Sequence, residues 1–98
     1  MATLIKVDGT TQTVSPRNKR RGFTLEEVYA LIGCDMVQSI NVANGAEENM
    51  LMDEEAKLKE GWVDRINNKA TDIFAKTYGR GVDLIIGDVL MCNNKEWK

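Results

Sequence analysis

The stretch Asp83-Leu84-Ile85-Ile86-Gly87-Asp88-Val89-Leu90-Met91-Cys92 decides the fold, because it has the most continuous apolar character in the chain. A short apolar run rich in branched residues is typical of a strand buried between two other strands. Gly87 interrupts the run and is expected to mark a bulge. We therefore predict a central strand over residues 83–92, beside which the remaining strands must pair.

Two hairpins are expected to supply those remaining strands. Residues 3–7 and 12–14 are rich in strand formers, and Asp8-Gly9 between them has the chemistry of a tight turn. Residues 36–42 and 49–52 form a second pair across a loop. Methionines recur on these predicted strands, and we expect them to fill the core or an interface: Met36, Met50, Met52 and Met91.

A first helix is predicted over residues 25–32. Thr24 and Glu27 have the spacing of a capping box, in which each side chain binds the backbone of the other residue. The apolar residues that follow recur at helical spacing, and Gly33 is suited to the left-handed position just after a helix. This helix must bury its apolar face against the sheet.

A second helix is predicted over residues 67–78, with Asn67 as its cap and Gly79 after its end. The segment between the second hairpin and this helix is less regular. Residues 53–60 have helical composition, but Gly61 and the few apolar residues limit them to a turn or two.

The order strand, strand, helix, strand, strand, helix, strand predicts an α+β fold for a single domain spanning residues 1–98. We expect a mostly antiparallel sheet of about five strands with both helices on one face, and a flexible tail over residues 93–98. One face or edge of the sheet would then remain uncovered. A homodimer or a higher homo-oligomer is the expected consequence.

The composition argues against catalysis. The chain has no histidine and two cysteines far apart in sequence, which excludes histidine-based catalysis and a four-thiolate zinc site. Asp53, Glu54 and Glu55 are the alternative as acid, base or metal ligands, but no nucleophile is spaced to join them. We therefore predict no catalytic residue, metal or cofactor. Cys34 and Cys92 are expected to be reduced, although their pairing stays open.

Four of the 13 basic residues fall within five positions, which we call the basic segment, residues 17–21. Without them the chain has nine basic and 15 acidic residues, a balance of −6. A local cluster of cations on an acidic molecule favours one anion site over broad coating of nucleic acid. A solvated loop is the competing interpretation. The predicted ligand contacts are Arg17, Lys19, Arg20 and Arg21.

Three further polar residues beside apolar elements are second candidates for ligand contact: Asn67, Thr71 and Asp88. Each also has a structural interpretation, respectively as a helix cap, a threonine bonded to the preceding helical turn, and a strand-end residue. Trp62 and Trp97 could stack on a nucleobase, but packing is the stronger expectation for so small a chain.

The chain resembles a family of small uncharacterised phage and plasmid proteins known only as a domain of unknown function. The resemblance covers most of the chain and rests on the order and spacing of short pieces. Ala56, Trp62 and the basic segment depart from the family pattern. The matching pieces are Asp8-Gly9, Leu25-Glu26-Glu27 leading to Gly33, Asp53-Glu54-Glu55-Ala56-Lys57-Leu58, Asn67 with Ala70-Thr71, and Gly87-Asp88-Val89-Leu90.

The resemblance implies a small accessory protein of a phage or another mobile element, located in the host cytoplasm. By analogy we expect it to bind an anionic nucleotide-like ligand without catalysis, as an anti-defence protein that sequesters a signalling nucleotide of host immunity. The alternatives are a module that binds and inhibits a host defence protein, and a small nucleic-acid-binding protein. No apolar run is long enough to span a bilayer, so we expect no membrane partner.

Overall fold

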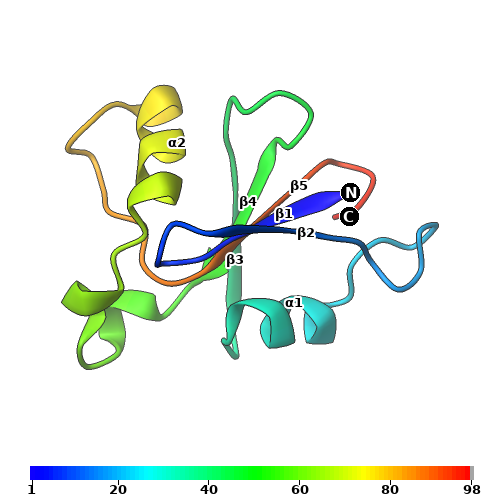
Figure 1. Cartoon of the computed structure of the whole chain (residues 1–98), viewed down its shortest axis with the longest axis horizontal. Coiled ribbons are helices and arrows are strands. Elements are labelled where there is room, and N and C mark those ends of the chain that lie inside the picture. The colour runs from blue at the N-terminus through cyan, green and yellow to red at the C-terminus, as the bar shows by residue number, and fades with distance from the viewer. Residues whose placement is uncertain (98) are drawn as a thin grey trace.

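Five short strands pair into one antiparallel sheet, and two α-helices pack against it (Figure 1). The computed structural model describes residues 1–97. The α+β class and the predicted order ββαββαβ are confirmed. In chain order the elements are β1 (Ala2–Ile5), β2 (Thr11–Val14), α1 (Leu25–Ile32), β3 (Val37–Asn41), β4 (Asn49–Asp53), the 3-10 turns η1 (Ala56–Leu58) and η2 (Trp62–Arg65), α2 (Asn68–Tyr78) and β5 (Val89–Cys92).

The central strand is shorter than predicted. The strand order is β2-β1-β5-β4-β3, so β5 is central as expected, but it begins at Val89. Residues 83–88 follow an irregular path, and Gly87, where a bulge was predicted, lies just before the start of the strand. Gly87 has a φ of 83° and its N–H donates to the Arg65 carbonyl at 2.7 Å, which turns the chain out of the sheet.

The two helices cover opposite faces of the sheet, so the prediction of one helical face was wrong. Side chains alternate between faces along a strand, and both sets are apolar in β5. Leu90 and Cys92 pack in a cluster with Val28 and Ile32 of α1. Val89 and Met91 pack in a second cluster that includes Ala70 of α2. The continuous apolar run of β5 therefore reflects burial on both faces.

Both helices begin and end where the sequence predicts. Thr24 accepts a hydrogen bond from the Glu27 N–H while the Glu27 carboxylate accepts from the Thr24 N–H, which completes the capping box. Gly33 follows α1 in the left-handed conformation. Asn67 caps α2 by accepting from the Ala70 N–H at 3.0 Å. Local capping contacts therefore mark these bounds.

The side chain of Asn67 also joins α2 to the sheet. It is fully buried, and its amide donates to the carbonyls of Ile5 at 3.0 Å and Gly87 at 2.9 Å. Its own N–H donates to the Ile85 carbonyl at 2.8 Å. One residue therefore ties the end of β1, the irregular segment 83–88 and the start of α2, and both amide protons have partners.

Asp88 and Thr71 complete these contacts. The Asp88 carboxylate accepts from the N–H of Val7 at 2.9 Å, just beyond the last β1–β5 pair. The Thr71 hydroxyl donates to the Asn67 carbonyl at 2.8 Å and accepts from the Ile85 N–H at 3.0 Å. These side chains satisfy backbone groups that lose their sheet partners where β1 and β5 diverge.

The end of the chain is tied into the fold, where a flexible tail was expected. Glu96 is buried, and Trp97 packs against the cluster beneath α1. This corrects the expectation for residues 93–97, whereas Lys98 lies outside the described residues. Among residues 1–97, no helix combines the length and the apolar character that crossing a membrane requires.

We predict that Asn67→Asp lowers the free energy of unfolding by at least about 3 kcal/mol, because a carboxylate keeps the Ala70 contact but leaves two buried carbonyls without donors. Urea denaturation measures the change. Asn68→Asp at the exposed neighbouring position is the matched control and should stay within about 0.5 kcal/mol. Equal losses in the two variants would contradict the assigned role of Asn67.

Candidate functional site

The basic segment is an ordered turn built around Asn18. The Asn18 side-chain oxygen accepts from the N–H groups of Arg20 and Arg21 at 3.0 and 3.1 Å, and its carbonyl accepts from the Gly22 N–H at 2.9 Å. This local side-chain bonding is the usual way in which asparagine stabilises a turn. The sequence shows the four cations in one segment, and Asn18 between Arg17 and Lys19 was the available signal for a turn, which was missed.

The turn is anchored at its end by the last described residues. The Phe23 N–H donates to the Glu96 carbonyl at 2.7 Å. Gly22 has a φ of 81°, and a Cβ placed on it would lie 2.2 Å from the Glu96 carbonyl oxygen. Only glycine fits this close approach. The basic segment is therefore held against the turn that follows β5.

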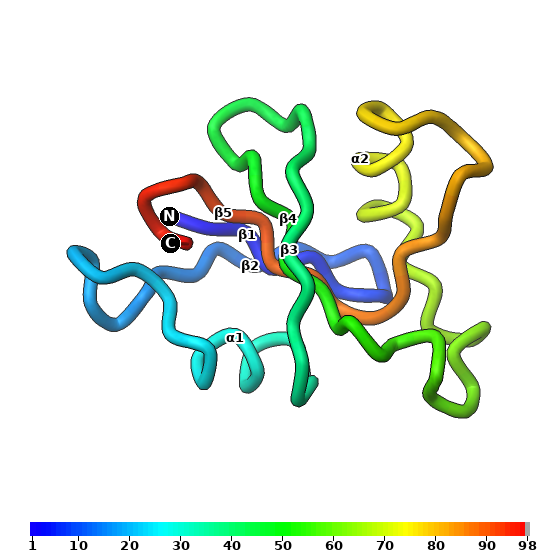
Figure 2. Tube along the Cα trace, turned by 180° about the vertical axis from the view of Figure 1, so that it is seen from behind, coloured from blue at the N-terminus to red at the C-terminus, as the bar shows by residue number. Residues whose placement is uncertain are grey.

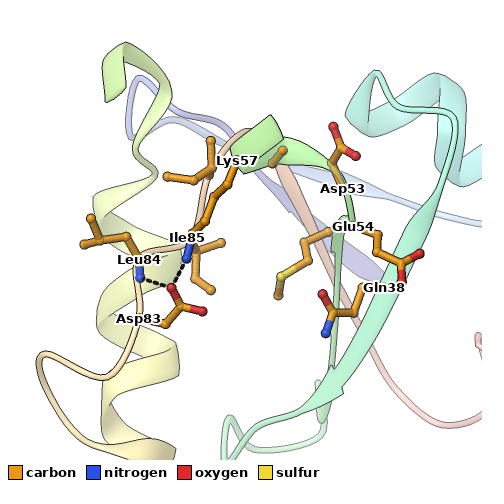
Figure 3. A pocket seen from close by; sticks show the side chains of 10 residues that line it. Gln38, Asp53, Glu54, Lys57, Asp83, Leu84 and Ile85 are labelled. Atoms are coloured by element: carbon orange, nitrogen blue, oxygen red, sulfur yellow. Dashed lines mark hydrogen bonds and ion pairs between the residues drawn. The ribbon is translucent and has the colours of Figure 1, made fainter. Parts of the chain in front are cut away.

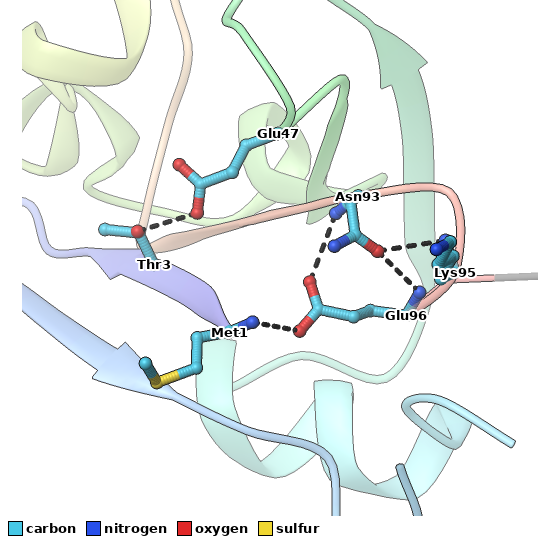
Figure 4. Close-up of polar contacts among 6 residues, drawn as sticks. All are labelled: Met1, Thr3, Glu47, Asn93, Lys95 and Glu96. Carbon is cyan, nitrogen blue, oxygen red and sulfur yellow. Dashed lines mark hydrogen bonds and ion pairs between the residues drawn. The ribbon is translucent and has the colours of Figure 1, made fainter. Parts of the chain in front are cut away.

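Glu96 is the centre of that anchor (Figure 4). Its buried carboxylate accepts from the Asn93 N–H at 3.2 Å and pairs with the amino group of Met1 at 3.0 Å. Asn93 in turn accepts from the N–H groups of Lys95 and Glu96. A buried carboxylate is stable only with such partners. This long-range contact could not be read from the sequence.

The Glu27 carboxylate occupies the anion position at the N-terminus of α1. Its carboxylate accepts from the Thr24 N–H at 2.7 Å and from the Arg17 N–H at 2.8 Å. These two bonds, that from Thr24 first, lower the pKa of Glu27 below its usual value. The helix N-terminus already has a carboxylate, so any anion on the basic segment must be held by the segment itself.

The cationic side chains project outward beside two open grooves. The Arg17 side chain is 92% exposed, and the other three basic residues of the segment are also exposed. One groove of about 350 Å³ is lined by Met1, Ser15, Pro16, Lys19, Asn93 and Glu96. The second, of about 340 Å³, is lined by Val14, Ser15, Arg17, Phe23, Glu27, Ala30 and Leu31.

The structure does not bring the second set of candidates to the basic segment. The basic segment lies at the end of the molecule opposite α2 (Figure 1). Asn67 and Thr71 belong to the start of α2, and Asp88 binds the N–H of Val7 near them. Asn67 is fully buried, and all three side chains bind backbone groups of the fold. They therefore contribute nothing to the geometry around residues 17–21.

Asp53 and Glu54, two of the three acidic residues considered as an alternative, line a small cleft of about 130 Å³ between the β3–β4 hairpin and the segment after α2 (Figure 3). Its charges are largely paired. Lys57 binds Asp83 and holds the pKa of that carboxyl below its usual value, while Lys59 binds Asp53. The carboxylates of Asp53 and Asp83 therefore already have cationic partners. Trp62, in η2 nearby, is partly buried.

Both cysteines are buried in the cluster beneath α1, and both are free thiols. Burial raises the pKa of Cys92 to about 12 and also raises the pKa of Cys34. Thiols in this state are poor nucleophiles, since the thiolate is the reactive form. Within residues 1–97, no three histidine, cysteine or acidic side chains are placed to share a metal ion.

Comparisons of this chain with protein-family models, curated proteins and solved structures found no match. The resemblance to a phage and plasmid family therefore stays a prediction from the sequence.

We predict that Glu27→Gln lowers the free energy of unfolding by about 1 kcal/mol at neutral pH, because glutamine keeps only one acceptor for the two N–H groups. A lowered pKa stabilises the fold above the usual glutamate pKa, and this contribution is lost as the pH falls through the pKa of the folded state. The difference between the two proteins should therefore shrink in acid.

Urea denaturation from neutral pH down to the acid range measures this dependence. Glu26→Gln is the control, since Glu26 is exposed in the same helical turn. A difference between wild type and Glu27→Gln that does not change with pH would contradict the role of the charge.

Proposed function

We propose that the protein is a non-enzymatic binding protein whose basic segment holds the phosphate groups of an anionic nucleotide-like ligand. The observation that carries this proposal is the Asn18 turn, because it fixes the backbone that carries Arg17, Lys19, Arg20 and Arg21. A fixed backbone loses less conformational freedom on binding than a mobile tail would. Arginine also presents a planar fork that matches two phosphate oxygens.

The grooves beside the turn offer space for the rest of such a ligand. Lys19 and Arg17 each contribute to one groove, and both grooves include Ser15. Volumes of 340 to 350 Å³ are in the range of small-molecule sites. The groove at Arg17 also has an apolar wall that includes Phe23 and Leu31, which suits the flat apolar surface of a base.

The charge distribution supports a small ligand over a long polyanion. The chain outside the basic segment has a balance of −6, so extended nucleic acid would meet repulsion beyond a few phosphates. The proposed setting is the cytoplasm of a host cell, where a mobile-element protein would sequester a signalling nucleotide. That setting rests on the sequence resemblance alone.

We predict that replacing all four basic residues of the segment by alanine weakens nucleotide binding by at least about 100-fold, because two or more charge-assisted hydrogen bonds are lost. Mass spectrometry of ligands released by heat or acid from the purified protein identifies the nucleotide. Calorimetry with that nucleotide then measures affinity, and thermal-shift assays with cyclic dinucleotides and cyclised ADP-ribose provide a second route.

Two controls separate a built site from net charge. Alanine at four exposed basic residues elsewhere makes the same charge change and should leave binding intact: Lys6, Lys69, Lys76 and Arg80. Gly22→Ala keeps every charge but displaces the turn from Glu96, so it should weaken binding. Gly45→Ala, at a positive φ with open space around it, is its control.

The proposed function is contradicted if the purified protein releases no nucleotide and shows no thermal shift with any of these compounds. A stoichiometric host protein recovered in a pull-down, and lost with the four alanines, would instead support the interaction module. A gel shift that weakens steeply with salt would support nucleic-acid binding.

A further inference from the structure

The strand β3 forms one edge of the sheet. It pairs with β4 alone in the strand order β2-β1-β5-β4-β3. Figure 2 shows β3 running across the front of the molecule, at the end of the sheet away from β2. Because both sheet faces carry a helix, this edge and that of β2 are the surfaces where the sheet can be extended.

The hydrogen-bond pattern shows which groups of β3 face outward. The Met36 carbonyl accepts from Glu54, and the Val42 N–H donates to Glu48, so the even-numbered residues bond to β4. In an antiparallel pair the intervening residues point their N–H and C=O groups the other way. The outward-facing residues are Val37, Ser39 and Asn41.

Most of this edge lacks the usual protection against strand pairing, and the Tyr78 hydroxyl reaches it at Asn41, its last residue. Residues 37–41 contain no charged residue and no proline, and their five pairs with β4 run in register without a bulge. Val37 and Ile40 are only partly buried, and Met36 just before the strand is 46% exposed. A regular, uncharged edge with apolar side chains is suited to another strand.

We propose that this edge binds β3 of a second copy of the chain in antiparallel orientation, giving a symmetric homodimer with one continuous sheet. With the two-fold axis at Ser39, each Ser39 exchanges two hydrogen bonds with the partner's Ser39, and Val37 pairs with the partner's Asn41. All three outward-facing residues are then used. This homodimer does not depend on the anion site.

A second copy fits this edge because its charges are compatible. Asp35 just before the strand falls opposite the partner's Ala43, so no like charges face each other across the axis. The Ala43 N–H binds Thr77 in the last turn of α2, which also carries Lys76, so a cation lies near the partner's aspartate. The pairing is therefore electrostatically neutral or favourable.

The two edges of the sheet also differ in how many residues they present for pairing with another strand. In β2 the outward-facing residues are Thr11 and Thr13, since Lys6 donates to the Thr10 carbonyl and the pattern alternates from there. The edge of β3 has three outward-facing residues, one more than β2. At the last of them, the Tyr78 hydroxyl donates to the Asn41 carbonyl, whose oxygen keeps a second lone pair for a partner strand.

Charged substitutions at Ser39 test the proposal, because a two-fold axis at this residue places it beside Ser39 of the partner. Sedimentation velocity from micromolar to near-millimolar concentration should show wild type at twice the chain mass of 11.0 kDa. Ser39→Glu and Ser39→Lys should each weaken the dimer at least about tenfold, through like-charge repulsion across the axis. An equimolar mixture of the two variants should restore dimerisation.

Thr13→Glu and Thr13→Lys make the same changes at an exposed, outward-facing position of the other edge and should leave the dimer intact. Circular dichroism verifies that each variant is folded. A wild type that is monomeric throughout the concentration range would overturn the proposal. So would a dimer unaffected by both Ser39 variants, or variants that stay apart when mixed.

Discussion

The rest of the structure depends on the buried side chain of Asn67. The β1–β5 ladder ends at Ile5 and Val89, and beyond it the chain turns out of the sheet at Gly87. Backbone carbonyls left inside the protein at such a point need donors, and the Asn67 amide supplies both of its protons. The same residue caps α2. One set of hydrogen bonds therefore places α2 over the second face of the sheet and sets where the central strand β5 starts.

Local sequence signals were sufficient for the elements but not for their arrangement. The capping box at Thr24 and Glu27 and the cap at Asn67 set the helix starts, because these contacts span only three residues. The apolar run over residues 83–92 predicted a central strand, yet it gave no means of separating β5 from the irregular segment before it. The continuous apolar run of β5 fits burial on both faces, but it does not say which helix covers which face.

In the candidate site, too, the sequence shows the local features but not the contacts between distant segments. The sequence identified the four cations and their nearness to a helix start, and Asn18 could have been recognised as the centre of their turn. The anchor at Glu96 lies more than 70 residues away and brings Gly22 against its carbonyl, which no local pattern encodes. Glu27 occupies the helix N-terminus, so the proposed anion site consists of the turn and its grooves.

The central claim is that the hydrogen bonds of the Asn67 side chain hold the fold together and break only when the whole domain unfolds. Hydrogen exchange of the Asn67 side-chain amide, followed by NMR, tests this most directly. The account predicts that the opening free energy measured for these protons equals the global free energy of unfolding. Exchange as fast as that of the side-chain amide of exposed Asn68 would contradict it.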